Sequence, residues 1–337
     1  MASLTANAQL SFSEQANRTL DKDLIEIVEA VNSNQDDLLK YLPWQECNML
    51  EGHKITRRSY VPVPTLRKDN EGVADTASIT QTVVEPTAML EDRSEIDEKH
   101  IMRLPASKRE AYRRNEDIAH IEGMGQKFAK MLIWGTTVSA ATASPEAFLG
   151  LQQRLHGLGT TCINNGGSNS GTMTSIYVLQ LGLKGAYCIY PAPLDDTMFM
   201  GLAVRNKGRE FRYTSVANRT GLYKYVTQFQ WACGLAVADE LAIGRVANID
   251  ITSGTGLKDF NEDKLIELLE VGHFNAGTII VMNKTIRTQA RIRLKDKTNV
   301  NWNIEEGLAG RKILTFAEFP VLGLDTNIIT NTETTVA

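Results

Sequence analysis

One long polar segment sets the strongest limit on how this chain can fold. Residues 53–90 read HKITRRSYVPVPTLRKDNEGVADTASITQTVVEPTAML, which is rich in Thr, Val and Arg and has prolines at 62, 64 and 86. The DNEG sequence at 69–72 is typical of a turn between two extended runs. Neither run carries a continuous apolar face, and an isolated two-stranded ribbon is marginally stable in water. We therefore expect a long hairpin that projects from the body and is held by a neighbouring molecule, with a flexible loop as the alternative.

The first fifty residues are acidic and amphipathic, with eight acidic residues against three basic ones. The sequence DKDLIEIVEAV (21–31) places four apolar residues on one helical stripe. A second short helix is expected after Gln35. The segment is too small to bury its own stripe, so we expect it to lie on another surface through Leu24, Ile27, Val28 and Val31.

Helix signals become strong after Pro105. Ser107 and Glu110 form a capping box in the sequence SKRE, which predicts a helix start. A long amphipathic helix is then predicted for residues 115–135, with Asn115 as its cap. Its expected apolar stripe consists of Ile118, Ile121, Met124, Phe128, Met131 and Leu132.

The second half of the chain combines helices with a mixed sheet. Ser144 and Pro145 predict another helix start, followed by Phe148, Leu151 and Leu155 as a buried face. Because helices come first and a sheet with helices follows, the predicted class is α+β. The further elements are two strands in 175–191, one long strand over 223–251 broken by Gly234 and Gly244, a helix at 262–271, a buried strand at 277–283, a basic helix at 285–296 and strands in 311–325.

The glycine-rich stretch TCINNGGSNSGT (161–172) approaches the spacing of a phosphate-binding loop. That loop needs a lysine and then a hydroxyl after its second glycine, but Thr172 and Met173 occupy these positions. Asn169 stands where a nucleophile elbow has its serine. We interpret the stretch as a polar turn whose glycines serve chain geometry. An enzyme that binds a nucleotide with the 164–172 loop remains the remote alternative.

Other signatures of chemistry are absent from the sequence. The four cysteines form no Cys-x-x-Cys pair, and the five histidines show no metal-binding spacing. We interpret His120 as a helix-surface residue, the SGTGLKD sequence (253–259) as a loop, and the EDRSEIDE sequence (91–98) as a solvated or interface charge run. We therefore predict no catalytic residue, no cofactor-binding residue, no metal site and no enzymatic activity.

Charge and hydropathy bound the partners and the compartment. The formal net charge of −4 and the pI of about 5.8 argue against tight, direct binding of nucleic acid, since such proteins are normally basic. The first residues lack the basic and apolar regions of a signal peptide, so we expect none, and no apolar run is long enough to span a membrane. The widely spaced cysteines are typical of a reducing compartment.

Basic and acidic segments alternate along the chain. Basic residues cluster at 54–58, 67–68 and 108–114, and acidic ones at 14–46 and 91–98. Pairing between copies would use both signs and would weaken at high salt; a mixed, soluble surface is the alternative. Besides the four apolar residues of the N-terminal segment, the candidates for contacts between subunits are Arg57, Arg58, Arg67, Lys68, Glu91 and Asp92.

The layout and several short blocks resemble the major capsid proteins of tailed bacteriophages, which have the Hong Kong-97-type fold. The resemblance covers roughly residues 90–330, and the first 90 residues match in layout only. The matching blocks are LIWGTTVSAATASPEAFLGLQQRL (132–155), CINNGGSNSGTMTSIYVLQLGLKGAYCIYP (162–191), FQWACGLAVADELAIGRVANIDI (229–251) and MNKTIRTQARIRL (282–294).

The resemblance implies an organisation into five parts. It implies an N-terminal arm at 1–45, an extended hairpin called the E-loop at 46–100, and a P domain with a spine helix at 101–165. Strands near 223–250 and the C-terminal tail would join this P domain. Residues 166–325 would form mainly the A domain, and 326–337 the tail.

The resemblance also implies a function. Copies would form hexamers and pentamers of an icosahedral shell that encloses double-stranded DNA without sequence-specific contact. The protein would reside in the virion capsid after assembly in the host cytoplasm, with scaffolding, portal and decoration or clamp proteins as partners, and no membrane. The subgroup it resembles is that of short-tailed phages, and an encapsulin-type shell is the alternative.

Overall fold

A computed structural model describes residues 19–20, 23–24, 35–50, 52–135, 148–192, 198–199, 201–215, 220–251, 260–294, 301–306 and 312–337. The chain divides into two compact units, each built from three separate segments. Unit 1 draws on residues 1–33, 89–128 and 193–232. Unit 2 draws on residues 34–88, 129–192 and 233–337.

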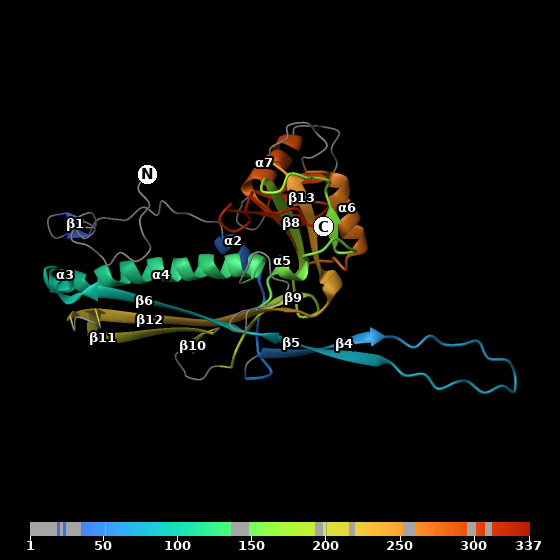
Figure 1. Ribbon diagram of the computed structural model, residues 1–337, viewed down its shortest axis with the longest axis horizontal. Helices are drawn as coiled ribbons and strands as arrows, with labels where there is room; N and C mark the ends of the chain where they lie inside the picture. The colour runs from blue at the N-terminus through green and yellow to red at the C-terminus, as the bar shows by residue number, and fades with distance from the viewer. Residues whose placement is uncertain are drawn as a thin grey trace. The chain divides into compact units, whose positions relative to one another are not determined.

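Unit 1 is built on one long helix and long antiparallel strands (Figure 1). Its strand β12 pairs with β11 and with β6, and β10 pairs with β11. The rings of Phe128 on the helix and Trp231 on β12 lie 4.8 Å apart. The elements that lie in this unit or begin or end in it are β1 (Thr19–Leu20), β2 (Asp23–Leu24), β6 (Ala88–Asp97), α3 (Glu98–Met102), α4 (Ala106–Trp134), β10 (Met198–Phe199), β11 (Leu202–Ser215) and β12 (Thr220–Val237).

Helix α4 is continuous, which corrects the prediction of a new start at Asn115. Ser107 lies inside the helix, so the predicted capping box does not form the cap. The helix ends where Gly135 adopts a left-handed backbone, with φ +68, and its N–H donates to Met131 O. The predicted stripe is buried at Met124, Phe128, Met131 and Leu132, whereas Ile118 and Ile121 are exposed.

Unit 2 contains a seven-stranded sheet in the order β15-β16-β17-β14-β8-β13-β7. Its central strands β8, β13 and β14 are buried almost throughout, as continuous apolar runs on both faces require. Helices α6 and α7 contribute Leu265, Leu268 and Ile286 to its core. The strands of this sheet are β7 (Cys162–Asn164), β8 (Met173–Gln180), β13 (Ile243–Asp250), β14 (Thr278–Asn283), β15 (Trp302–Glu306), β16 (Lys312–Phe316) and β17 (Phe319–Leu324).

The remaining elements of unit 2 include a second group of paired strands and a hairpin. Strand β9 pairs in parallel with β3, and its other edge pairs with residues 234–237 at the end of β12. These elements are α2 (Gln35–Tyr41), β3 (Trp44–Glu46), β4 (Gly52–Tyr60), β5 (Ile79–Pro86), α5 (Leu151–Arg154), β9 (Ala186–Tyr190), η1 (Glu240–Ala242), α6 (Glu262–Val271) and α7 (Lys284–Arg293).

Several predicted boundaries in the second half need correction. The long strand over 223–251 is interrupted at Ala238–Ala242, where Asp239 caps the short helix η1, and not at Gly234 or Gly244. Helix α5 starts at Leu151, after Gly150, while Ser144 and Pro145 lie outside the described residues. The predicted buried face of Phe148, Leu151 and Leu155 is confirmed.

The glycine-rich stretch is a turn between β7 and β8, as predicted. Gly166 and Gly171 have φ values of +97 and +89, which side chains with a Cβ rarely adopt. A Cβ on Gly167 would lie 2.4 Å from the carbonyl oxygen of Asn248. The glycines therefore allow a sharp path close to β13.

The predicted hairpin is formed by β4 and β5, which pair antiparallel from Gly52↔Pro86 to Tyr60↔Ile79. Residues 61–78 between them contain no strand. At the turn the N–H of Glu71 donates to Lys68 O, and Asn70 adopts a φ of +66. Figure 1 shows this hairpin as a long extension from its root at Gly52 and Pro86.

Candidate assembly surfaces

The outer part of the β4–β5 hairpin exposes apolar side chains that nothing in the described chain covers. Val61, Val63, Leu66 and Val73 are 65%, 69%, 105% and 55% exposed. Scattered exposed apolar residues are ordinary on a protein surface, but here they follow one another along a segment with no core of its own. Such a segment gains stability when another surface buries it.

The root of the hairpin is fixed by apolar packing on the β4 side. Ile55 belongs to a buried cluster with Cys47, Tyr187, Ile189 and Ala236. The neighbouring His53 is also buried, and its ring packs edge-on against Tyr187 with centroids 5.7 Å apart. Burial lowers the pKa of His53.

Two arginines bind the same root. Arg154 forms a bidentate ion pair with Glu85 on β5, with N–O distances of 2.9 and 2.6 Å. Arg57 on β4 donates to Glu240 Oε1 at 2.5 Å and to Val237 O at 2.6 Å. The side chain of Glu85 is 2% exposed and that of Glu240 is 80% exposed, so water screens only the second pair strongly.

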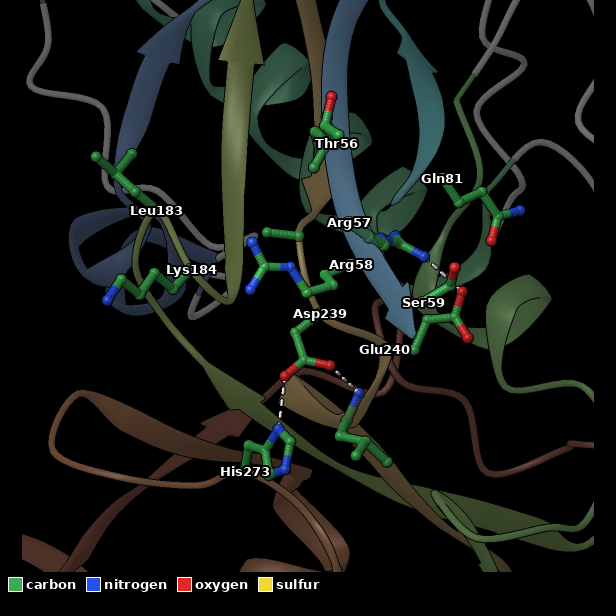
Figure 2. A pocket seen from close by; sticks show the side chains of 13 residues that line it. Thr56, Arg57, Arg58, Ser59, Gln81, Leu183, Lys184, Asp239, Glu240 and His273 are labelled. Carbon is green, nitrogen blue, oxygen red and sulfur yellow. Dashed lines mark hydrogen bonds and ion pairs between the residues drawn. The ribbon is translucent and has the colours of Figure 1, made fainter. Parts of the chain in front are cut away.

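An open cleft of about 680 Å³ lies beside β4. Figure 2 shows Arg57 reaching Glu240 there, and His273 Nδ1 lying 2.6 Å from Asp239 Oδ2. Although burial acts in the opposite direction, bonds from His273 and the Leu241 amide lower the pKa of Asp239. The two acidic groups that line the cleft, Asp239 and Glu240, are therefore both bound by basic residues of the same chain.

Unit 1 carries a second polar surface on β6, β12 and α4. Glu91 accepts hydrogen bonds from Arg93, Gln228 and Gln230, which lower its pKa. Asp92 Oδ2 lies 2.6 Å from Nδ1 of His120, whose ring stacks on Phe229. Residues 91–97 of this run therefore lie in strand β6 and make contacts inside the chain, and His120 is partly buried on α4.

His120 makes the stability of unit 1 depend on pH. Its bonds with Glu116 and Asp92 raise its pKa to about 9, although partial burial opposes the shift. An ordinary histidine titrates near pH 6.5. The stabilisation is therefore complete below about pH 6.5 and is lost as the pH rises towards 9, by at most about 3 kcal/mol. Urea unfolding of unassembled subunits across this pH range should show the loss of stability, and His120→Gln should make the free energy of unfolding depend less on pH. If the wild type and His120→Gln show the same pH dependence, the raised pKa of His120 is not its cause.

The structure separates the predicted contact residues. Leu24 lies in β2, while Ile27, Val28 and Val31 lie outside the described residues. Arg57 is bound within the chain, Arg58 lines the cleft, and Arg67 and Lys68 lie at the exposed hairpin turn. Sequence reasoning missed Glu85 and Arg154, since nothing in their spacing signals that two residues so far apart will meet.

A buried polar network fastens the C-terminal segment to the sheet of unit 2. Arg245 Nη2 lies 2.9 Å from Glu333 Oε2, and both side chains are 1% exposed. Arg245 also donates to Ser175 Oγ and Leu155 O. The backbone of Glu333 bonds to Met173 O and to the N–H of Gly171. This network serves the fold, because solvent cannot reach it.

Within the part of the chain that the structure describes, no group of His, Cys, Asp and Glu could hold a metal ion. No helix in the same part of the chain is long and apolar enough to cross a membrane.

Comparisons with known proteins identify a family and a fold. The family model described as major capsid protein GP7 matches residues 20–337. No curated protein matches the chain. The chain is similar to the solved structure of bacteriophage Epsilon15, with 24% identity over 99% of both chains and a TM-score of 0.70.

More distant solved structures are also similar. The capsid of bacteriophage JBD30 shares 11% identity over 89% of this chain and 92% of its own, with a TM-score of 0.47. The SrpI encapsulin complex from Synechococcus elongatus shares 12% identity over 73% of this chain and 98% of its own, with a TM-score of 0.43.

The similarity to the Epsilon15 structure confirms the predicted α+β, Hong Kong-97-type fold. The family match confirms that the protein is not an enzyme, because the family is structural, and it removes the alternative of a nucleotide-binding enzyme. Since the family match spans nearly the whole sequence, the chain belongs to the major capsid protein GP7 family and is a structural protein of the bacteriophage capsid shell.

Proposed function

We propose that copies of this protein form hexamers and pentamers of an icosahedral shell, and that the β4–β5 hairpin of each copy lies across a neighbouring subunit. One observation carries the proposal: residues 61–78 expose Val61, Val63, Leu66 and Val73 on a segment without a core. A neighbouring subunit is the natural cover in a protein that self-associates into shells. The basic Arg67 and Lys68 at the turn would meet acidic groups of that neighbour.

The domain scheme follows the same proposal. Residues 46–100 would act as the E-loop, 101–165 as the P domain with α4 as its spine helix, and 166–325 mainly as the A domain. The acidic segment at 1–45 would clamp a further subunit through its apolar stripe, and residues 326–337 would form the tail. Glu91 and Asp92 would contribute to subunit contacts in addition to their bonds within the chain.

The enclosed cargo would be double-stranded DNA, held without sequence-specific contact. The net charge of −4 fits loose enclosure better than tight binding, because phosphate-binding surfaces are normally basic. Scaffolding, portal and decoration or clamp proteins would be the partners during assembly in the host cytoplasm. The short blocks of sequence favour the short-tailed phage subgroup.

The shell and its contents can be tested together. Expressed chain should sediment as closed, uniform particles that electron microscopy resolves into hexamers and pentamers, and particles from infected cells should contain nuclease-protected double-stranded DNA. Particles that instead retain a host or co-encoded protein cargo and no DNA would favour the encapsulin alternative. Subunits that never form closed particles, even when the proposed scaffolding, portal and decoration or clamp proteins are present, would contradict the proposal.

A further inference from the structure

The buried ion pair between Arg154 and Glu85 lies at the first rungs of the hairpin. Glu85 pairs with His53 in the ladder, next to the terminal pair Gly52↔Pro86. The two terminal guanidinium nitrogens of Arg154 bind the carboxylate, and the side chains of Arg154 and Glu85 are 13% and 2% exposed. A planar fork facing a carboxylate fixes direction as well as distance.

Arg154 connects this carboxylate to other parts of unit 2. Its guanidinium also donates to Leu149 O and Leu235 O. Helix α5, which carries Arg154, begins after Gly150, and a Cβ on Gly150 would lie 2.2 Å from the backbone nitrogen of Gly135. Through Arg154, the hairpin root therefore contacts the end of β12. Helix α5 also packs against Gly135 at the end of α4, where the two backbones lie too close together for a side chain to fit between them.

The ion pair that Arg57 forms at the root is weaker. Arg57 donates to Val237 O and binds Glu240 (Figure 2), but that glutamate is 80% exposed. Exposed pairs contribute little and are screened by salt. Apolar packing of Ile55 holds β4 in place, but unlike a bidentate hydrogen bond it does not fix the angle at which the hairpin leaves its root.

We propose that Arg154 is a positioning residue for assembly: its bidentate bond to Glu85 sets the direction in which the hairpin leaves unit 2. The proposal rests on the proposed role of the hairpin between subunits. The extended chain from Glu85 to Asn70 reaches up to about 50 Å. An error of about 10° at the root would therefore move the turn by about 9 Å, which is enough to miss its site on a neighbour.

The test compares Arg154→Lys, which keeps the charge and removes the fork, with Ile280→Val, a buried methyl deletion in β14 away from the root. Spin labels on Thr80→Cys in β5 and Glu270→Cys in α6, both exposed, would report the hairpin direction by pulsed electron paramagnetic resonance. The native cysteines Cys47, Cys162, Cys188 and Cys233 are buried, so we expect them not to react with the label under native conditions.

We expect Arg154→Lys to broaden the distribution of distances between the two spin labels. Where Arg154→Lys and Ile280→Val have equal urea midpoints of unfolding, we expect the particle yield of Arg154→Lys to be at least about tenfold lower. An unchanged distribution, or a yield no lower than that of Ile280→Val, would overturn the proposal. If Arg154→Lys does not fold, Glu85→Gln, which keeps the shape and removes the charge, is measured in the same way against the same two criteria.

The two proposals fail in different ways. If a chain lacking residues 61–78 assembles normally, the hairpin is not needed and the proposed function of the hairpin fails. If that truncated chain is defective while Arg154→Lys assembles and orients its hairpin normally, only the role of Arg154 fails.

Discussion

Replacing Glu333 by alanine is expected to lower the free energy of unfolding by about 3–5 kcal/mol, because it leaves the buried Arg245 without its counter-charge. Arg245 is fully buried and lies 2.9 Å from the Glu333 carboxylate. Burial raises the pKa of Glu333, and Arg245 opposes that shift. Each charge is therefore tolerated mainly because the other is present. Urea unfolding of unassembled subunits measures the loss.

A matched control separates this effect from general changes in the C-terminal segment. Thr334 is exposed and follows Glu333 directly, so Thr334→Ala should change the free energy of unfolding by less than about 0.5 kcal/mol. The double variant Arg245→Met with Glu333→Leu should recover much of the loss, since apolar pairs of similar volume often replace buried ion pairs well. A Glu333→Ala variant as stable as Thr334→Ala would show that the pair contributes little.

Elements with strong local signals were predicted well from the sequence. Helix α6 spans Glu262–Val271 and ends before Gly272, as predicted, and the structure adds Asn261 as its cap. The hairpin was predicted from its prolines, its turn sequence and its lack of an apolar face. The turn at 164–172 was predicted from its glycine, asparagine and serine residues, which favour tight turns. In each case the information lies within a few neighbouring residues.

Other features depend on contacts that local patterns do not encode. Ser107 and Asn115 are good capping residues, yet both lie inside α4, because packing of Tyr112 and Phe128 favours one continuous helix over two short ones. Strand β11 was missed because its sequence, LAVRNKGREFRYTS, is polar at many positions and gains order by pairing along β12.

The residues that determine the hairpin root were missed for the same reason. Glu85 and Arg154 are both ordinary charged residues in the sequence, and only the fold brings them together. Residues predicted from charge runs, such as Arg57, Glu91 and Asp92, proved to bind partners within the chain. Charge runs therefore indicate where ion pairs form but not whether the partner belongs to the same copy.

Replacing residues 61–78 by Asn-Gly is expected to lower particle yield by at least about 100-fold and to leave subunit stability within about 1 kcal/mol. The two-residue turn joins Tyr60 directly to Ile79, which already face each other at the end of the ladder. The removed residues bury almost nothing in the subunit, since all are exposed except Pro62, which is partly exposed. Sedimentation measures the yield, and urea unfolding measures the stability.

A pair of point variants then tests whether apolar contact is the cause. Leu66, at the hairpin, and Ile292, on α7, are both exposed apolar residues, at 105% and 57%. Leu66→Ser should reduce particle yield because an apolar anchor buried between subunits contributes about 2 kcal/mol or more, whereas Ile292→Ser should not. Equal yields from the two variants would mean that the outer hairpin acts through its length or backbone rather than its side chains. Since the unassembled subunit exposes both residues, any difference between the variants must arise in the assembled shell.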